Sequence, residues 1–412
     1  MAFIHEGSCE CAKSELDIFS VPPTQTSIEH GSFSDFGTSS TLAAGSPFEF
    51  NLSSSGDEYL DLANSYLYLK VKVLKEDGTA LGNDDPVGPV NNFMHSLFSQ
   101  VDVSLNGVSI TNQVKNYPYR AYIENLLSYG PDAKMSQLTS ALFYKDEPGK
   151  MDKHNPKAAA EADRNSGLVK RAAFIAGSKE LELVGRIHAD IFYQMKYMLN
   201  EVTVNIKMHP SNANFCLMGD GAFKVDITHA KMYVHRVKIS PSIYLAHANA
   251  LEHGTAKYPI KRVVCKAEML AGGILSTNIE RLFPGQLPSR LIIGFVTNKA
   301  YSGHMTANPF NFQHFSVTDV AVKIDGNSSG IKPLENLNYT AGNYITAYKT
   351  LFSGLGKENH DEGNDKDRLD YPRGFTLYAF DLTPDLSDNE NFNLVRNLTH
   401  CTYQCLVRYS LN

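Results

Sequence analysis

Apolar and polar residues alternate with a period of two in several stretches of the chain. In residues 66–73 the odd positions are Leu or Val and the even positions are Tyr or Lys. Successive side chains of a strand point to opposite faces, so this pattern predicts strands with one buried face. Residues 101–106, 202–209 and 319–325 alternate in the same way, and Asn-Gly or Asp-Gly turns separate several strand-like stretches. One-sided alternation with frequent turns favours antiparallel sheets packed face to face.

Two other stretches have the spacing of helices. In 119–127 and in 344–352, apolar and aromatic residues fall at positions i, i+3, i+4, i+7 and i+8. This spacing places them on one face of a helix, so each stretch is predicted to be a helix that packs against a sheet. Gly130-Pro131 and Gly354 follow the two stretches and mark where each helix is expected to end.

Each predicted helix follows a similar strand, and this pairing divides the chain into two units. The strands that begin at Phe98 and Phe315 share Phe, Ser, Asp and Val at matching positions. The strands lie 217 residues apart and the helices 225 residues apart, near half of the 412-residue chain. Such an offset favours two tandem copies of one domain. The alternative is that strand–turn–helix units resemble one another by chance.

The boundary between the two units is predicted near residues 240–255. Ser240-Pro241-Ser242 ends a strand-rich stretch, and a helical segment follows at 243–251. The next strands are expected near Tyr258–Lys266. The predicted layout is therefore an N-terminal arm (1–30), a first domain (31–245) and a second domain (246–412).

Three segments are predicted to lie on the surface. The arm is polar and contains Pro22-Pro23, so it is not expected to join a core strand. Residues 144–168 are rich in Lys, Asp, Ala and Asn, which predicts an insertion in the first domain. Residues 356–370 are polar throughout and are expected to form an exposed loop in the second domain.

Composition and charge narrow the class of protein. Hydrophobic residues make up 42% of the chain and charged residues 20%, which is typical of a globular protein. The net charge of −6 argues against a surface that grips a nucleic-acid backbone. The N-terminus lacks the pattern of a signal peptide, and no apolar run is long enough for a spanning helix. Six cysteines are too few for a disulfide scaffold, and their spacing does not complete a metal site.

The motifs that could carry chemistry have structural explanations. Gly326–Gly330 matches G-x-S-x-G, but Pro333 follows closely and opposes the helix that a hydrolase nucleophile elbow requires. The acidic run over 361–367 lacks the glycine and glutamate of an EF-hand loop, so a solvated loop is expected there. The fourteen histidines are scattered and form no H-E-x-x-H motif. We therefore predict no catalytic, cofactor-binding or metal-binding residues, and no cofactor.

Seven blocks of the sequence, in order along the chain, resemble one known family. They are ELDIFSVPPTQTSI at 15–28, GDEYLDL at 56–62, LFSQVDVSLNG at 97–107, YPYRAYIENLLSYG at 117–130, GRIHADI at 185–191, NPFNFQHF at 308–315 and AFDLTPDLSD at 379–388. The family is the double jelly-roll (hexon-like) major capsid proteins of Polinton/Maverick elements and adintoviruses, within the adenovirus and giant-virus capsid lineage. The blocks span nearly the whole chain, so the resemblance is far more specific than any single motif.

The resemblance implies an all-β fold of two tandem eight-stranded jelly rolls, with short helices in loops. It also implies a non-enzymatic subunit that forms homotrimers, which tile as pseudo-hexamers into an icosahedral shell around double-stranded DNA. The expected partners are further copies of the chain, penton proteins and minor capsid proteins, with no sequence-specific binding of nucleic acid. The expected location is the virion capsid, after synthesis in the host cytoplasm and assembly in the cytoplasm or nucleus.

Two other functions fit paired β-sandwiches. A carbohydrate-active enzyme would need two carboxylates in one cleft, which a linear sequence does not show. A carbohydrate-binding or adhesion module would need exposed aromatic residues on one face and often calcium. Both share the fold class with a capsid protein and differ from it in oligomeric state.

Overall fold

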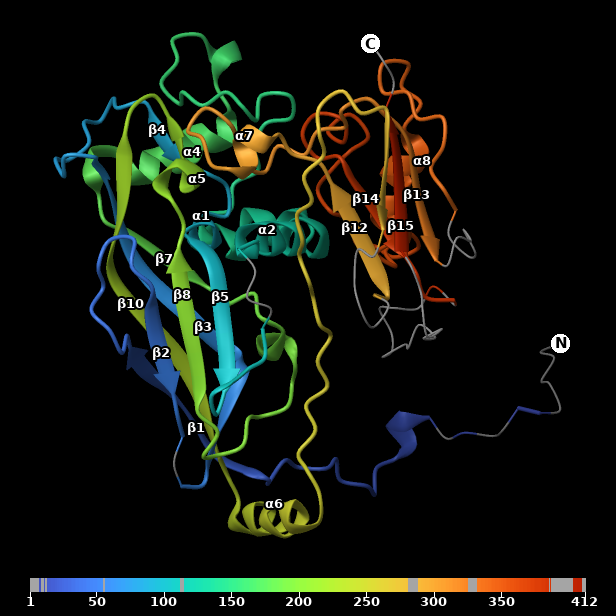
Figure 1. Cartoon of the computed structure of the whole chain (residues 1–412). Coiled ribbons are helices and arrows are strands. Elements are labelled where there is room, and N and C mark those ends of the chain that lie inside the picture. The colour runs from blue at the N-terminus through green and yellow to red at the C-terminus, as the bar shows by residue number, and fades with distance from the viewer. Residues whose placement is uncertain are drawn as a thin grey trace.

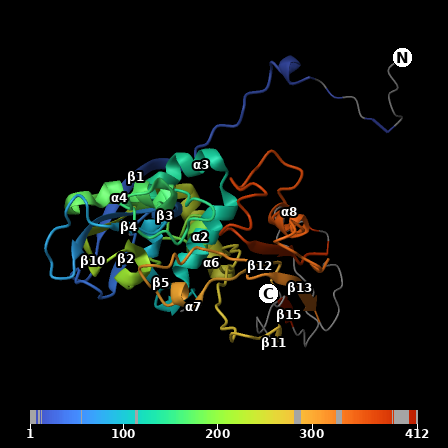
Figure 2. The ribbon, with the colours of Figure 1, turned by 90° about the horizontal axis from the view of Figure 1, so that it is seen from above.

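Two β-sandwiches stand side by side in the chain (Figures 1 and 2). The computed structural model describes residues 7, 8, 11, 13–54, 56–111, 115–280, 288–324, 332–384, 386 and 403–409. We call the part built from strands β1 to β10 the first sandwich, and the part built from β11 to β15 the second sandwich. Among the described residues, no helix is long and apolar enough to cross a membrane.

The first sandwich consists of two four-stranded antiparallel sheets and a short strand pair. Hydrogen bonds order one sheet as β1-β10-β3-β7 and the other as β2-β8-β5-β6. This strand order, in which sequential strands alternate between the two sheets except for the hairpin β5–β6, is that of a jelly roll. The strands are β1 (Ile28–Gly37), β2 (Phe48–Leu52), β3 (Glu58–Lys75), β5 (Phe98–Leu105), β6 (Val108–Ser109), β7 (Leu181–Gly185), β8 (Val204–Pro210) and β10 (Phe223–Ile239), with β4 (Val87–Pro89) paired to β9 (Leu217–Gly219).

The apolar side chains of the alternating stretches fill the core of the first sandwich, as predicted. Leu67, Leu69, Val71 and Val73 of β3 are each at most 1% exposed, and the tyrosines and lysines between them are half-buried. The alternating residues of β5 and β8 enter the same hydrophobic cluster from the other sheet. Each fully buried aliphatic side chain contributes roughly 1.5–3 kcal/mol, so a continuous row of them fixes the register of the strand.

The second sandwich repeats part of this arrangement. Its strands are ordered β11-β15-β13 and β12-β14. Because the sequence repeat aligns β13 with β5, these orders reproduce the β2-β8-β5 and β3-β7 parts of the first sandwich. The described residues hold five strands of the second sandwich, so its predicted eight cannot be counted within them. The strands are β11 (Ser276–Glu280), β12 (Arg290–Gly294), β13 (Val317–Ile324), β14 (Leu377–Asp381) and β15 (Tyr403–Tyr409).

Both predicted helices are confirmed. They are α2 (Tyr117–Ser128) and α8 (Ile345–Ser353), whose last residues lie 225 apart, as the repeat requires. Tyr122 and the aligned Ala347 are both fully buried, so the two helices turn the same face inward. The remaining helices are short or lie in connections: α1 (Phe93–Ser96), α3 (Pro131–Met135), α4 (Ser166–Ile175), α5 (Ala213–Cys216), α6 (Pro241–His253) and α7 (Asn298–Tyr301), with 3₁₀ turns η1 (Ser14–Leu16), η2 (Gln137–Ala141), η3 (Glu161–Asp163), η4 (Ala176–Ser178) and η5 (Asp190–Tyr193).

The strands expected near Tyr258–Lys266 are not formed. The helix expected just before them is α6, but residues 255–270 then run without a strand partner. Side chains of the first sandwich bind this segment instead: Asn116 donates to the carbonyl of Cys265, and the backbone N–H of Val263 donates to Asp190. These side chains take up backbone groups that a strand ladder would have used.

The insertion predicted at 144–168 is only partly a surface feature. Asp146, Met151, Asn165 and Leu168 are at most 2% exposed. The loop at 356–370 is mostly exposed as expected, yet its Asn364 and Lys366 are buried along with Lys134 of α3. Both segments are therefore anchored where the sandwiches meet, a contact that composition alone did not reveal.

The N-terminal arm extends away from the body of the molecule (Figures 1 and 2). Residues 13–27 are exposed throughout, and only the turn η1 interrupts their extended path. The arm is shorter than the predicted 1–30, because β1 begins at Ile28 and pairs with β10. As expected, Pro22-Pro23 lies outside any strand.

Candidate functional site at the junction of the two sandwiches

A buried ion pair marks the centre of the junction. The guanidinium of Arg171 lies 2.6 Å from a carboxylate oxygen of Asp146, and both side chains are fully buried. Arg171 also donates to the carbonyls of Pro89 (2.8 Å) and Tyr144 (2.5 Å). The second sandwich contributes Asn308, whose amide donates to the other oxygen of Asp146 at 3.1 Å. A buried charge is tolerated when its partners are complete, and here the two halves of the chain supply them together.

Aromatic rings pack across the same junction. Tyr122 of α2 stacks on Phe310 with a centroid distance of 4.1 Å and an interplanar angle of 6°. Tyr119 contacts both Phe310 and Phe312 edge to face. One hydrophobic cluster thus contains residues of both sandwiches, so the second sandwich shares a core with the helix that covers the first.

Three lysines gather beside this core. Lys134 donates to the backbone carbonyls of Leu126 and Asn364 at 2.6 Å each. Lys145 donates to the backbone carbonyl of Asp365 and to the carboxylate of Asp370. Burial lowers the pKa of Lys134 to about 6. Burial, helped by the charge of Lys145, lowers the pKa of Lys366 to about 7. The ammonium of Lys366 also lies 4.5 Å from the centre of the Phe375 ring. All three amines donate to backbone carbonyls, so their arrangement holds the 356–370 loop in place.

A second polar cluster lies under α2. His188 contacts Glu124 (2.5 Å) and the hydroxyl of Tyr193 (2.8 Å), and Arg120 bridges Glu124 to Asp190. Burial raises the pKa of Glu124, but the His188 bond and the Arg120 charge outweigh it and leave the pKa below its usual value. His188 is only 4% exposed, whereas Tyr193 at the edge of the cluster is 42% exposed. Arg120, Glu124, His188 and Asp190 fall within two blocks of the family resemblance, 117–130 and 185–191, whereas Tyr193 lies just beyond the second block. No spacing rule predicted that these residues are in contact.

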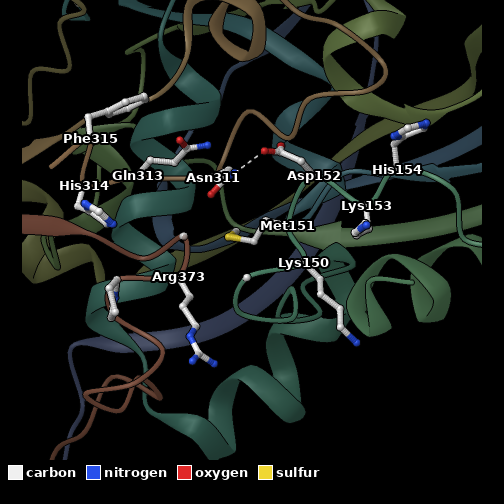
Figure 3. A pocket seen from close by; sticks show the side chains of 13 residues that line it. Lys150, Met151, Asp152, Lys153, His154, Asn311, Gln313, His314, Phe315 and Arg373 are labelled. Atoms are coloured by element: carbon white, nitrogen blue, oxygen red, sulfur yellow. Dashed lines mark hydrogen bonds between the residues drawn. The ribbon is translucent and has the colours of Figure 1, made fainter. Parts of the chain in front are cut away.

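A pocket of about 620 Å³ opens along the junction (Figure 3). Residues 149–154 of the first half face residues 311, 313–315 and 372–374 of the second half across it. The backbone N–H of Gly149 donates to the carbonyl of Arg373 at 2.9 Å, which joins the two walls. Asp152 accepts from the backbone N–H of Asn308 at 2.8 Å and from the amide of Asn311 at 2.6 Å. The pocket is therefore built by both halves and held in shape by their hydrogen bonds.

Within the part of the chain that the structure describes, the sequence motifs do not meet in a catalytic site. The G-x-S-x-G stretch at 326–330 lies outside the described residues, as do Cys9, Cys401 and the side chain of Cys405. In the acidic run, Asp365 binds lysines and Asp367 accepts from the backbone N–H groups of Leu369 and Asp370. Among the described residues, no group of three or more His, Cys, Asp or Glu side chains is placed to hold a metal ion.

Comparison with known proteins fits this architecture. No family model matches the sequence. An uncharacterized protein of Caenorhabditis elegans, F54H12.2, is 27% identical over 391 residues, which cover 91% of this chain and 89% of that protein. Among solved structures, the Sputnik virophage determined by cryo-EM matches 98% of this chain and 87% of its own, with a TM-score of 0.59 and 10% identity. PBCV-1 VP54, fitted into a cryo-EM reconstruction of Sputnik, matches 95% and 87%, with a TM-score of 0.54 and 10% identity.

The chain has a double jelly-roll fold. The match runs through both sandwiches, and the strand order of the first is that of a complete jelly roll. The all-β fold class expected from the alternating pattern is thereby confirmed.

Proposed function

We propose that this protein is a major capsid protein, a structural and non-enzymatic subunit of a viral shell. The observation that carries the proposal is the pair of jelly rolls in one chain, matched over 98% of its length by a virophage structure. Two similar units per chain give a threefold assembly a nearly sixfold outline, and such closed units pack edge to edge. The function then lies in the outer edges of the sandwiches.

The finer parts of the proposal follow the family resemblance. The subunit forms homotrimers that act as pseudo-hexameric tiles of an icosahedral shell around double-stranded DNA. Penton and minor capsid proteins complete the shell in the host cell. We propose a Polinton/Maverick or adintovirus origin, because a relative that is 27% identical comes from an animal, Caenorhabditis elegans, and an element carried in a host genome would account for that.

The N-terminal arm is proposed to bridge neighbouring subunits. Leu16, Ile18, Phe19 and Val21 are 71%, 75%, 93% and 87% exposed, although such side chains are normally buried. A second subunit that covers them would stabilise the contact through the hydrophobic effect. Deletion of residues 1–14 should spare trimers and weaken shells, and deletion through Val21 should weaken shells further. Loss of soluble trimers in either variant would contradict this role.

The pocket offers little to the alternative of a carbohydrate-active enzyme. Such an enzyme uses two carboxylates that flank the scissile bond. The pocket is lined by one carboxylate, Asp152, and both of its oxygens accept hydrogen bonds from Asn308 and Asn311. The site described here therefore favours a structural role.

The mass of the protein in solution tests the proposal. Sedimentation-equilibrium analysis should give three times the chain mass of 45.6 kDa. A stable monomer at micromolar concentration would contradict the proposed trimer.

A further inference from the structure

A long extended segment joins the two sandwiches. Residues 255–270, which we call the linker, run from α6 toward β11 without a turn or bend (Figure 1). Backbone groups of Val263 and Cys265 form hydrogen bonds of 3.2–3.4 Å with three side chains of the first sandwich, Asp190, Arg120 and Asn116. Alternate residues of an extended chain direct their backbone groups to opposite edges, so one edge of the linker is held by the first sandwich.

The opposite edge of the linker lacks such partners. It is formed by the backbone of Ile260, Arg262 and Val264, whose N–H and C=O groups make no hydrogen bond with any described residue. The sequence predicts a strand over this stretch, Tyr258–Lys266, and an open edge of this kind is a template for a strand from another chain. The linker is therefore a strand position that the single chain leaves unfilled.

The linker is basic, although the whole chain has a net charge of −6. Four cations and one anion give it a net charge of +3, and the four cationic side chains are exposed. These residues are Lys257, Lys261, Arg262, Lys266 and Glu268. Opposite charges on paired strands stabilise the pairing, so the open edge favours an acidic strand.

The N-terminal arm has the complementary properties. Residues 1–27 carry four acidic residues and one lysine, a net charge of −3. Glu15 and Asp17 alternate with Leu16 and Ile18, which is the pattern of a strand with one charged face and one apolar face. Pro22-Pro23 opposes pairing beyond this stretch, so residues 15–21 are the part of the arm that can join a ladder.

The arm also has the length to reach another molecule. It is anchored next to α6, where the backbone N–H of Ser240 donates to the carbonyl of Ser27 at 2.9 Å. From there it runs away from the body of its own chain (Figures 1 and 2). The eleven residues from Leu16 to Ser27 span roughly 35–40 Å when extended, which is enough to cross to a neighbouring copy.

We infer that residues 15–21 of the arm pair as a strand with residues 260–264 of the linker in a second copy of this chain. Backbone hydrogen bonds to the open edge hold the arm there, and its carboxylates lie beside the exposed cations of the linker. Leu16 and Ile18 leave water, which adds a hydrophobic contribution. The inference rests on the proposed bridging role of the arm and names the surface that receives it.

Hydrogen exchange tests whether the arm covers the linker. In the full-length protein, the amides of residues 258–266 should exchange about tenfold more slowly than in a variant that lacks residues 1–21, because an added strand protects them. Both proteins are measured at the same concentration, at which the full-length protein forms assemblies. Equal exchange in the two proteins would overturn the inference.

Reversal of charge separates this pairing from other effects of assembly. The linker variant K257E/R262E should lose most of the protection, and addition of E15K/D17K should restore it, because both partners then carry reversed charge. The matched control K170E/K179E changes two lysines that are exposed in the first half but lie outside the linker. It should keep the exchange rate within about twofold of the wild type. The inference is wrong if the linker variant and the control behave alike.

Cross-linking identifies which copy receives the arm. In a mixture of the truncated variant, isotope-labelled, with K257E/R262E, the arm belongs to one chain and the unaltered linker to the other. A carbodiimide should join Asp17 of the first of these chains to a linker lysine of the second. Cross-links confined to single chains in the full-length protein would place the arm on its own linker and overturn the inference.

Sedimentation of the same samples separates this inference from the proposed function. Trimers and larger assemblies whose linker is unprotected would contradict the pairing of arm and linker alone. A monomer with an unprotected linker would contradict the proposed function as well.

Discussion

The two sandwiches share a strand order but use their residues differently. In the first, two four-stranded sheets enclose a core of their own, and Phe98 lies inside it. In the second, the described strands share a hydrophobic cluster with α2 of the first half, and the matching Phe315 faces outward. The two copies therefore share a strand order, but the aligned phenylalanine fills the core of the first copy and lines the pocket at the junction in the second.

The largest effect should come from the phenylalanine pair. F98A removes a fully buried ring and should lower the free energy of unfolding by about 3–5 kcal/mol. F315A should change it by less than about 0.5 kcal/mol, because its ring is half exposed and its removal leaves no cavity. Urea denaturation of the two variants measures both values. Equal losses would show that the two sandwiches use this position alike.

The buried pair at the junction should come next. D146N leaves the Arg171 guanidinium buried without a full counter-charge and should cost about 3 kcal/mol. The hydrogen bond from the Asn308 amide to Asp146 would also weaken. Because Asn308 belongs to the second half of the chain, the substitution should weaken the contact between the two sandwiches. Limited proteolysis near residues 144–168 and urea denaturation would detect it. A D146N protein as stable as the wild type would show that the Asp146–Arg171 ion pair does not stabilise the junction.

The buried lysines predict a dependence on pH. The folded pKa values of Lys134 (about 6) and Lys366 (about 7) lie below the ordinary value of 10.5, so the unfolded chain binds more protons between pH 7 and 10. Stability should therefore rise with pH across that window, by about 1 kcal/mol per pH unit. Lys145, Lys357, Asp365 and Asp370 surround the two amines and set the size of the effect.

The control for this prediction is K134M, which keeps the length of the side chain but cannot bind a proton. Its stability should vary less with pH from 7 to 9 than that of the wild type, as measured by urea denaturation at each pH. An identical slope in the two proteins would show that Lys134 is charged in the folded state.

The smallest effect should come from an exposed pair. Lys153 and Asp163 lie 2.7 Å apart, but about half of each side chain is exposed. K153Q should change the free energy of unfolding by less than about 1 kcal/mol. A loss as large as that of D146N would mean that the 144–168 segment depends on its surface charges as well as its buried anchor.

The sequence predicted the elements better than their contacts. The alternation in β3, β5, β8 and β13 and the spacing in α2 and α8 are local signals, and all of these elements formed where expected. The resemblance also named the blocks that hold Glu124 and His188. The missed features depend on long-range contacts: Asp146 and Lys366 look like loop residues until the other half of the chain covers them. The exposure of Phe315 could not be predicted from the sequence, because the residues around it match those around the buried Phe98.

Electron microscopy of the purified protein shows whether the chain assembles as a shell subunit. Negatively stained single particles should show a six-lobed, nearly hexagonal outline with threefold symmetry, since each subunit contributes two sandwiches. Larger assemblies should show these particles tiled edge to edge. Isolated two-lobed particles at all protein concentrations, with no threefold class, would contradict the account of this chain as a shell subunit.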